Sequence, residues 1–410
     1  MKIGIVGQGY VGLPLSMAFA SSGVETIGIE ISPEIILNLS RGVSHIVDVS
    51  SEKLEQVIHE GKYSITDDYT VVQECDAIII CVPTPLTHDR LPDVSLLKSA
   101  ITEIAPFLGS SSLLVSESTS FPGTLRHLIS PIIKELNPNY DSIMLATAPE
   151  RVDPGNRKWN QANTPRLIGG LSEKATKSAV EIYSRICENI VEVSSPEVAE
   201  SAKLLENSFR LINIAFINEF AQAMDGLGIS AHEVIAAAAS KPYGFMPFYP
   251  GLGAGGHCIP VDPVYLSSIL ETKSIGHPLL KHAIKENQKS YKFVVNKINE
   301  SEKKIRSILL IGMSYKPGIS DLRESPALEL FHDLLEDYEV SFYDENFDSI
   351  GSHKRVEDLK GFDLVLIVNL IDEIHYKILK MENDLVLNCT GVSLSHLGIS
   401  SIFDGNSPLV

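Results

Sequence analysis

Short apolar runs alternate with amphipathic stretches over roughly the first 150 residues, and this alternation predicts β-strands connected by helices. Most of these runs are apolar at nearly every position, which is typical of parallel strands that helices cover on both faces. The pattern therefore predicts a doubly wound α/β domain. Its strands are expected at residues 2–6, 26–31, 77–81, 113–115 and 143–148.

The pattern changes at residue 196, where helical periodicity continues to residue 227 with almost no helix-breaking residue. A helix of about thirty residues is much longer than a typical globular helix, so we expect it to connect two domains. A shorter helix is predicted over 231–239. A further helix, rich in Lys and Glu, is predicted over about 278–298 and reads as a polar outer helix or linker.

The last hundred or so residues repeat the α/β pattern, with predicted strands at 308–313, 340–343, 364–368 and 385–387. Ser325 and Pro326 suit the N-cap and first position of a helix that follows the first of these strands. The predicted fold is α/β, with two Rossmann-like doubly wound domains joined by a long central helix. The expected domain boundaries are 1–195, 196–300 and 301–410.

Gly7, Gly9 and Gly12 follow the first strand directly and open a helix, as the dinucleotide-binding fingerprint requires. Gly7 makes the turn, Gly9 lets a pyrophosphate approach, and Gly12 lets the helix pack on the strand. Glu30 ends the next strand, where an acidic side chain binds the adenosine ribose hydroxyls and repels a 2′-phosphate. The sequence therefore predicts NAD, in preference to NADP.

Polar and proline residues follow the later strands of this domain, where ligands of a doubly wound sheet collect. Pro83 and Thr84 follow the third predicted strand, Thr119 follows the fourth and Glu150 the fifth. We expect the first three to border the cofactor. For Glu150, position alone favours an ordinary solvated carboxylate at a strand end over a catalytic role.

Residues 249–263 contain four glycines and three prolines and are predicted to be neither helix nor strand. Such a loop can approach another molecule closely, and it carries Cys258 with Asp262 four residues later. The loop therefore looks suited to presenting Cys258. The alternative, a lone Cys buried as a small hydrophobe, is the commoner case and stays open at this point.

Three polar residues of the long predicted helix are spaced to share one face: Lys203, Asn207 and Arg210. A solvated helix face is the plainer interpretation of these charges. Lys316 and Arg323 stand where the second α/β domain could bind a phosphorylated ligand, and paired surface charges are the alternative for both.

Composition excludes several classes of protein. The chain has 410 residues, 44% of them hydrophobic, and a formal net charge of −18, which disfavours nonspecific binding to nucleic acid or an anionic membrane. No apolar run approaches the roughly 20 residues of a membrane span, and the chain starts on a strand, so we expect a cytoplasmic protein. Five cysteines without a CxxC pair, and histidines without metal-ligand spacing, predict no structural metal and no disulfide framework.

Seven segments taken together resemble the UDP-glucose/GDP-mannose dehydrogenase family of nucleotide-sugar dehydrogenases, in order and over nearly the whole chain. The resemblance implies an NAD domain, a helical middle domain with a dimer contact, and a C-terminal domain that binds the UDP-sugar. A homodimer or higher homo-oligomer is expected. The segments are 7–14, 81–85, 117–119, 148–155, 203–207, 255–262 and 315–317 with 323–326.

The family's reaction oxidises C6 of the sugar from a primary alcohol to a carboxylate, through two hydride transfers to two NAD molecules. By resemblance, Cys258 is the nucleophile that forms a thiohemiacetal and then a thioester. Lys203 and Asn207 match oxyanion-stabilising positions, and Asp262 matches a residue that works with Lys203 on a water and proton path. Glu150 matches the general base that activates the hydrolytic water, and Thr119 the residue that positions it.

The resemblance also implies which residues hold each ligand. Those expected at NAD are Gly7, Gly9, Tyr10, Val11, Gly12, Glu30, Pro83, Thr84, Thr119 and Arg323. Those expected at the sugar nucleotide are Glu150, Arg151, Val152, Lys203, Asn207, Arg210, Tyr249, Gly253, Gly255, His257 and Lys316.

Two departures from the UDP-glucose branch bear on the substrate. Pro154 stands where that branch commonly keeps a second glutamate, and the segment from Lys241 has no Arg to reach a neighbouring subunit. Residues 149–156 and 245–251 instead resemble the branch that acts on UDP-N-acetylhexosamines. UDP-N-acetylglucosamine is the first choice, ahead of UDP-N-acetylmannosamine and UDP-glucose.

Two other classes of function are alternatives at this point. A nucleotide-sugar epimerase that retains NAD uses a Tyr-x-x-x-Lys pair on one helix, and near matches such as the one from Tyr291 lie outside the cofactor domain. A noncatalytic NAD-sensing scaffold would not need the catalytic residues of the family. Cys258 and Lys203 are both present, which argues against this alternative. The release of NADH separates these alternatives from a dehydrogenase.

Overall fold

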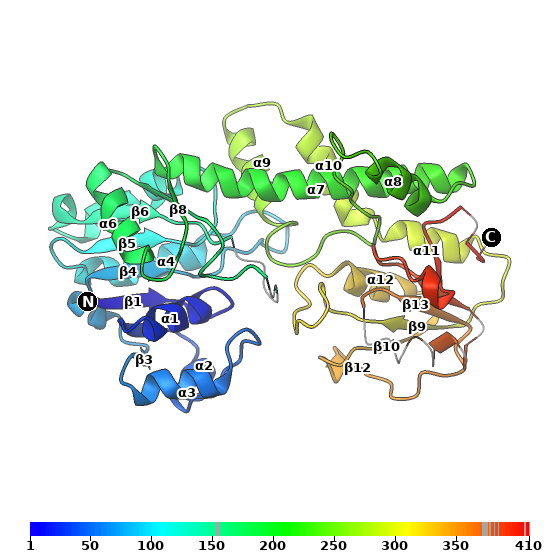
Figure 1. Cartoon of the computed structure of the whole chain (residues 1–410), viewed down its shortest axis with the longest axis horizontal. Coiled ribbons are helices and arrows are strands. Elements are labelled where there is room, and N and C mark those ends of the chain that lie inside the picture. The colour runs from blue at the N-terminus through cyan, green and yellow to red at the C-terminus, as the bar shows by residue number, and fades with distance from the viewer. Residues whose placement is uncertain are drawn as a thin grey trace. The chain divides into compact units, whose positions relative to one another are not determined.

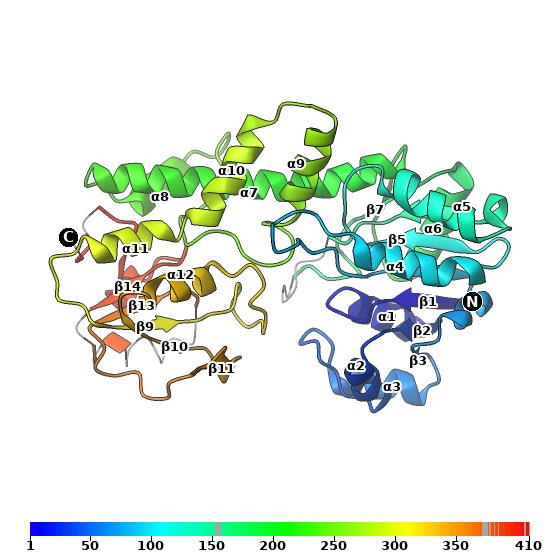
Figure 2. The ribbon, with the colours of Figure 1, turned by 180° about the vertical axis from the view of Figure 1, so that it is seen from behind.

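The computed structural model describes residues 1–151, 156, 158–370, 376, 379–380, 382–383, 385–405 and 407–409. The chain forms two compact units (Figures 1 and 2). Unit 1 comprises Met1–Glu206 and Val264–Ser274, and unit 2 comprises Asn207–Pro263 and Ile275–Val410. The predicted boundaries of three domains stay a prediction.

Unit 1 contains an eight-stranded sheet in the order β3-β2-β1-β4-β5-β6-β7-β8. Strands β3 to β6 are parallel and have the 3-2-1-4-5-6 order of a dinucleotide-binding fold. Strand β7 is antiparallel to β6. The strands are β1 Lys2–Val6, β2 Glu25–Ile29, β3 Tyr63–Thr66, β4 Ala77–Ile80, β5 Leu113–Ser116, β6 Met144–Thr147, β7 Arg166–Gly170 and β8 Ile190–Glu192.

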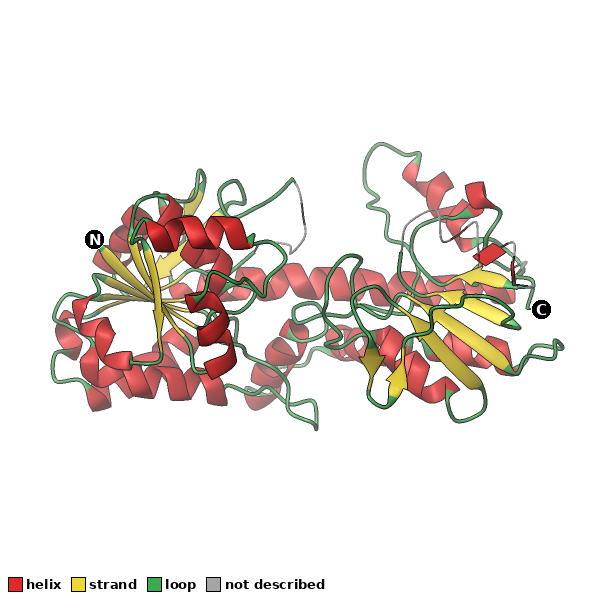
Figure 3. Ribbon diagram, turned by 90° about the horizontal axis from the view of Figure 1, so that it is seen from below, coloured by secondary structure: helices red, strands yellow, loops and turns green. Residues whose placement is uncertain are grey.

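Helices cover both faces of this sheet, as Figure 3 shows. Side chains alternate across a strand, so Ile78 and Ile80 of β4 enter one apolar core and Ala77 and Ile79 enter the other. This explains why the strand is apolar at every position. The helices of unit 1 are α1 Gly12–Ser21, α2 Pro33–Ser40, α3 Ser51–His59, α4 Ser95–Ile104, α5 Ser130–Leu136 and α6 Glu173–Tyr183.

Unit 2 contains a second, all-parallel sheet in the order β10-β9-β13-β14-β15. The fold class predicted from the sequence is therefore confirmed. The strands of this sheet are β9 Ser307–Ile311, β10 Glu339–Tyr343, β13 Leu364–Ile367, β14 Val386–Asn388 and β15 Ser400–Ser401, with a separate pair β11 Ser349–Ile350 and β12 His353–Lys354. Its helices are α8 Ala231–Ala239, α10 Pro278–Lys289, α11 Lys292–Asn299 and α12 Pro326–Leu334.

Helix α7, Pro196–Gly226, has 31 residues and agrees closely with the predicted helix. Its first part belongs to unit 1 and the rest, from Asn207, to unit 2. Within unit 1, the Glu200 carboxylate accepts hydrogen bonds from the backbone N–H groups of Gly123, at 2.6 Å, and Leu125, at 3.0 Å. These bonds anchor the start of α7 to the turn that precedes α5. Helix α9, Asp262–Thr272, likewise has residues in both units.

The single helix predicted over 278–298 is wrong, because α10 ends at Lys289 and α11 starts at Lys292. Between them, the Ser290 hydroxyl donates to the carbonyl of Glu286 at 2.8 Å, and such bonds to the preceding turn bend helices. Ser325 lies at the N-cap of α12 as predicted, but its hydroxyl donates to the Met313 carbonyl instead of capping the helix.

Among the residues that the structure describes, no helix combines the length and the apolar character that crossing a bilayer requires.

Candidate functional site

The turn between β1 and α1 has the geometry that the glycine pattern predicts. Gly7 has φ +87°, and a Cβ there would lie 2.8 Å from the Cys81 carbonyl oxygen. A Cβ on Gly12 would lie 1.8 Å from the Gly7 carbonyl oxygen, so both positions require glycine. A Cβ on Gly9 would meet no atom within 4 Å, which leaves that side of the turn open. The remaining predicted residues of the turn, Tyr10 and Val11, lead directly into α1.

Glu30 follows β2 and is tied to this glycine turn. Its Oε2 accepts a hydrogen bond from the Gln8 N–H at 2.8 Å, and its Oε1 accepts from the N–H groups of Ile31 and Ser32 at 2.8 and 3.1 Å. In dinucleotide-binding folds, a carboxylate beside the phosphate-binding turn binds the hydroxyls of the adenosine ribose. The turn and Glu30 therefore fit NAD.

The carboxyl ends of parallel strands bring further predicted residues to one edge of the unit 1 sheet. Pro83 and Thr84 follow β4, Thr119 follows β5, and Glu150 follows β6. The Ser118 hydroxyl donates to the Val82 carbonyl at 2.7 Å and joins the segments after β4 and β5. Glu150 is buried, with 6% of its surface exposed, so the solvated carboxylate expected from its position alone is not what the structure contains.

A buried charge cluster behind this edge was not predicted. Arg166 on β7 donates from Nη1 to Oε1 of Glu117 at 2.6 Å, and the hydroxyl of Tyr183 donates to the same oxygen. All three side chains are buried, and Oε2 of Glu117 has no hydrogen-bond partner. Burial raises the pKa of Glu117, Arg166 lowers it, and the nearby charge of Glu150 raises it further. The charge of Glu150 therefore acts on the ionisation of Glu117.

Two of the predicted arginines hold carboxylates within their own units. Arg151 donates from Nε to Glu206 at 3.1 Å and from Nη1 to the Pro165 carbonyl at 2.8 Å. Arg323 donates from Nη2 to Asp321 at 2.6 Å. A phosphate or sugar that uses either arginine would have to share it with these partners. Val152 lies outside the described residues.

The polar residues on α7 divide between the units. Lys203, in unit 1, is buried, with 8% of its surface exposed. Asn207, in unit 2, donates from Nδ2 to Oδ2 of Asp262 at 2.6 Å, so the structure joins two residues that the family resemblance assigns to the same site. Arg210, one turn further along, is exposed.

Cys258 differs from the other four cysteines, all of which the structure describes. It is half-buried, whereas the others are buried. Its Sγ lies 3.0 Å from Nδ1 of His257, and its carbonyl accepts from the Asp262 N–H at 2.9 Å. Burial raises the pKa of each buried thiol and makes the reactive thiolate scarce. The buried cysteines are Cys75, Cys81, Cys187 and Cys389.

The backbone of the rest of the loop lies close to other segments of unit 2. Gly253 has φ +123°, which favours glycine. A Cβ on Gly255 would lie 2.8 Å from the Glu324 carbonyl oxygen and from Cβ of Tyr315. Tyr249, at the start of the loop, is 43% exposed and stacks on His232. Lys316 is half-buried just after β9, as the position of its segment predicts.

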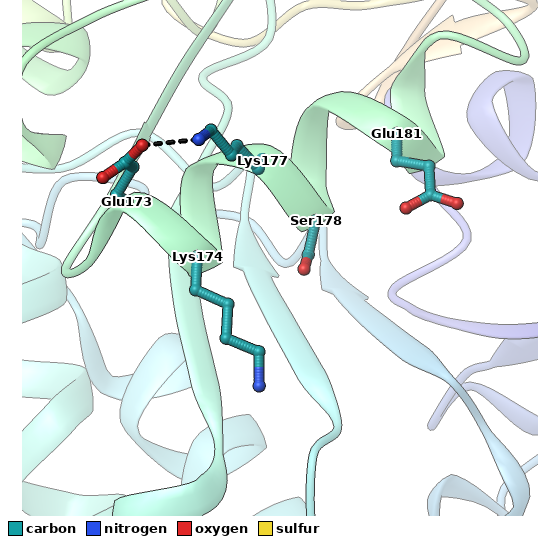
Figure 4. A pocket seen from close by; sticks show the side chains of 5 residues that line it. All are labelled: Glu173, Lys174, Lys177, Ser178 and Glu181. Carbon is teal, nitrogen blue, oxygen red and sulfur yellow. Dashed lines mark hydrogen bonds and ion pairs between the residues drawn. The ribbon is translucent and has the colours of Figure 1, made fainter.

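A surface pocket on α6 lies apart from the predicted residues. Figure 4 shows its five lining side chains, which all come from this one helix. Lys177 and Glu173 form an ion pair at 2.5 Å, as charges on a solvated helix face commonly do. The lining residues are Glu173, Lys174, Lys177, Ser178 and Glu181. Elsewhere, within the described part of the chain, no three His, Cys, Asp or Glu side chains are grouped to hold a metal ion.

Three family models match successive parts of the chain. All are described as UDP-glucose/GDP-mannose dehydrogenase family: the NAD binding domain matches residues 1–187, the central domain 197–289, and the UDP binding domain 309–392.

Individual relatives match most of the chain. A UDP-N-acetyl-D-mannosamine dehydrogenase of Pyrococcus horikoshii is 34% identical over 90% of this chain and 88% of its own length. An NDP-N-acetyl-D-galactosaminuronic acid dehydrogenase of Ralstonia nicotianae is 32% identical over 82% and 80%. The solved structure of UDP-D-ManNAc dehydrogenase from Pyrococcus horikoshii has a TM-score of 0.86 and 30% identity, covering 99% of this chain and 100% of that one.

Proposed function

Because the chain belongs to the UDP-glucose/GDP-mannose dehydrogenase family, we propose that it oxidises C6 of a UDP-N-acetylhexosamine to a carboxylate. It is an NAD-dependent nucleotide-sugar dehydrogenase. The observation that best supports four-electron oxidation is the environment of Cys258, the half-buried cysteine whose Sγ lies 3.0 Å from an imidazole nitrogen. A thiol beside a base is the arrangement that covalent catalysis needs.

The relatives favour the manno epimer of the substrate. The Pyrococcus horikoshii protein is named for UDP-N-acetyl-D-mannosamine, and the Ralstonia nicotianae protein for an N-acetyl-D-galactosaminuronic acid. We therefore place UDP-N-acetylmannosamine ahead of UDP-N-acetylglucosamine, the first choice from sequence alone. An N-acetylated hexosamine is common to these names.

NAD supplies the hydride acceptor for each of the two oxidations. The backbone of the glycine turn, with Gly9 open to the pyrophosphate, and the Glu30 carboxylate would hold it. In the first oxidation, the C6 hydroxyl loses its proton to the path that includes Lys203 and Asp262, and C6 loses a hydride. The product is an aldehyde at C6.

In the second oxidation, the thiolate of Cys258 attacks the aldehyde and forms a carbon–sulfur bond. The resulting oxyanion is stabilised by Lys203 and by Asn207, whose amide is oriented by its bond to Asp262. Loss of a second hydride from C6 leaves a thioester on Cys258. The aldehyde is thus never free to diffuse away or to become hydrated.

Hydrolysis completes the reaction. Glu150 takes a proton from a water that Thr119 positions, the hydroxide attacks the thioester carbon, and the carbon–sulfur bond breaks to release the Cys258 thiolate. One alcohol, two NAD⁺ and one water give one carboxylate, two NADH and three protons. Burial keeps Glu150 away from bulk water, so the base acts on a bound water.

The test is to incubate the protein with NAD and a panel of UDP-sugars while following NADH absorbance. We expect two NADH per UDP-N-acetylhexosamine, the fastest turnover with UDP-N-acetylmannosamine, and a stalled intermediate in Cys258→Ser. One NADH per sugar with an accumulated aldehyde would contradict four-electron oxidation. Turnover of UDP-glucose alone would exclude the N-acetyl assignment, and sugar conversion without NADH would indicate an epimerase.

We also propose a homodimer or higher homo-oligomer. The part of α7 within unit 2 leaves the aromatic side chains of Phe209 and Phe216 45% and 62% exposed, which is unusual for a helix face in contact only with water. Light scattering on the purified protein measures its mass directly. A monomer at micromolar concentration would contradict the proposal.

A further inference from the structure

The loop that carries Cys258 is held in place although it forms neither helix nor strand from residue 249 to 261. Backbone N–H and C=O groups removed from water need partners, and this loop cannot supply them by repetitive structure. The Gly256 N–H donates to the Arg323 carbonyl at 3.0 Å, and side chains from α10 and from the unit 2 part of α7 supply further partners. Neither side chain belongs to the residues that the sequence singles out.

Asn287 on α10 pairs with both backbone groups of one loop residue. Its Oδ1 accepts a hydrogen bond from the Ala254 N–H at 2.7 Å, and its Nδ2 donates to the Ala254 carbonyl at 3.0 Å. The side chain is buried, with 7% of the residue exposed. A Cβ on Gly253 would lie 3.0 Å from the Asn287 carbonyl oxygen and 3.2 Å from Oδ1, so the backbone approaches this helix closely. An amide that both donates and accepts fixes the loop as a strand partner would.

Asn218 on α7 makes the corresponding contact two residues before Gly253. Its Oδ1 accepts from the Gly251 N–H at 2.8 Å, and its Nδ2 donates to Ser290 at 3.3 Å. Asn218 is also buried, with 3% of its surface exposed. The loop is thus hydrogen-bonded to two helices through two buried amides.

Apolar contacts follow the same pattern. Leu211 and Ala215 of α7 pack with Ala283 of α10, and the loop residues Ala254 and Ile259 pack against this cluster. Ile259 directly follows Cys258. The position of the thiol is therefore coupled to the helix pair on which the amides lie.

We propose that Asn287, assisted by Asn218, is a positioning residue that fixes Cys258 for attack on the C6 aldehyde. The inference rests on the proposed role of Cys258 as nucleophile. Attack requires the sulfur at a defined distance and angle from C6, and a displacement of about 1 Å can cost about 100-fold in rate. Because the first oxidation does not use the thiol, loss of the hydrogen bonds from Asn287 should slow only the second oxidation.

The experiment compares Asn287→Ala, which removes both bonds to Ala254, with Asn287→Asp, which keeps the side-chain volume but replaces the donor with a carboxylate oxygen and adds a negative charge. Asn296→Ala is the matched control, because Asn296 is exposed on the neighbouring helix α11. Single-turnover reactions with UDP-N-acetylmannosamine and excess NAD resolve the two NADH steps. We expect both Asn287 variants to slow the second step about 10- to 100-fold, with the first step and KM within about threefold of the control.

Hydrogen exchange provides a second measurement that does not depend on catalysis. The Ala254 amide should exchange at least about tenfold faster in both Asn287 variants than in Asn296→Ala. Equal slowing of both NADH steps, or variants indistinguishable from Asn296→Ala in both measurements, would overturn the proposal. If the wild-type protein itself releases one NADH per sugar, the proposed function fails. Faster exchange at Ala254 in the Asn287 variants would then still support the positioning of the loop by Asn287, but not a role for that positioning in catalysis.

Discussion

The Nδ1 atom of His257 lies 3.0 Å from the Sγ atom of Cys258. The family resemblance places His257 only among the substrate-binding residues, whereas in the structure it also contacts the thiol. At this distance an imidazole can accept the thiol proton and hold the resulting thiolate as an ion pair. Since the thiolate is the reacting species, we expect His257 to raise the fraction of Cys258 that is ready to attack near neutral pH.

We predict that His257→Gln slows turnover about tenfold at pH 7 and by less at pH 9, where the thiol ionises without help. The rate of Cys258 alkylation by iodoacetamide, measured from pH 6 to pH 10, should shift toward higher pH in the variant. His396→Gln, at an exposed position, is the control. An unchanged alkylation profile would show that the imidazole does not act on the thiol.

Glu200 gives a prediction about stability and pH. Burial raises its pKa from 4.5 to about 7, although the backbone N–H groups of Leu125 and Gly123 oppose the shift. A carboxyl with a higher pKa in the folded chain binds its proton more tightly when folded, so the stability it contributes is present below pH 4.5 and is lost as pH rises to 7. The difference between the two pKa values corresponds to roughly 3 kcal/mol in the free energy of unfolding. Glu200→Gln should remove most of this dependence between pH 4.5 and 7.

The control for Glu200 lies one turn earlier on the same helix. A hydrogen bond from Arg126 lowers the pKa of Glu197 to about 2, so its stabilising effect is present above pH 4.5 and is lost only as pH falls toward 2. Glu197→Gln should therefore lower stability by a similar amount throughout pH 4.5–7. Urea denaturation at several pH values measures both. Parallel pH profiles for wild type and Glu200→Gln would contradict the prediction.

The buried pair of Glu117 and Arg166 predicts strong coupling between two substitutions. Arg166→Met leaves a buried carboxylate without its cation, and we expect a loss of about 3–5 kcal/mol in the free energy of unfolding. Because Arg166 lowers the pKa of Glu117, its removal raises that pKa further, and the loss should grow as pH rises from 5 to 8. Adding Glu117→Gln removes the charge and should recover much of the stability. A double variant as unstable as Arg166→Met would show that lost packing, not charge, dominates.

Much of the fold follows from local patterns in the sequence. Helix α8 and strand β1 have the predicted bounds, because their apolar spacing is unambiguous over the whole element. The strands missed are β3, β7, β8, β11, β12 and β15. Of these, β7 ends in two glycines, and β8 has only three residues, two of them exposed. Neither carries an apolar run long enough to be recognised.

The residues of the candidate site also differ in whether local sequence patterns predict them. The glycine turn and Glu30 are local features, and the sequence predicts them with their spacing. Asn287 lies in a segment whose Lys and Glu content predicts a polar helix, and only its spacing from the buried Leu280 and Ala283 indicates that its amide is on the apolar face. The partners of Glu117 could not be predicted, since Arg166 and Tyr183 follow it by 49 and 66 residues and no spacing rule connects them.

Glu30 provides a test of cofactor choice that is independent of the sugar. Its carboxylate accepts three backbone N–H bonds, which hold it in a fixed orientation next to the phosphate-binding turn. A hydrogen bond from a ribose hydroxyl to a charged group contributes about 1.5–3 kcal/mol. Glu30→Gln should therefore raise KM for NAD about 10- to 100-fold and, by removing the negative charge, narrow the preference for NAD over NADP. Initial rates at saturating UDP-sugar with each cofactor measure both effects.

Glu34→Gln, which removes a carboxylate from the exposed first turn of α2, controls for the change in net charge. Since Glu30→Gln also loses backbone bonds, rates are compared at a temperature where circular dichroism finds both variants folded. An unchanged KM for NAD in the folded variant would exclude Glu30 from the ribose site.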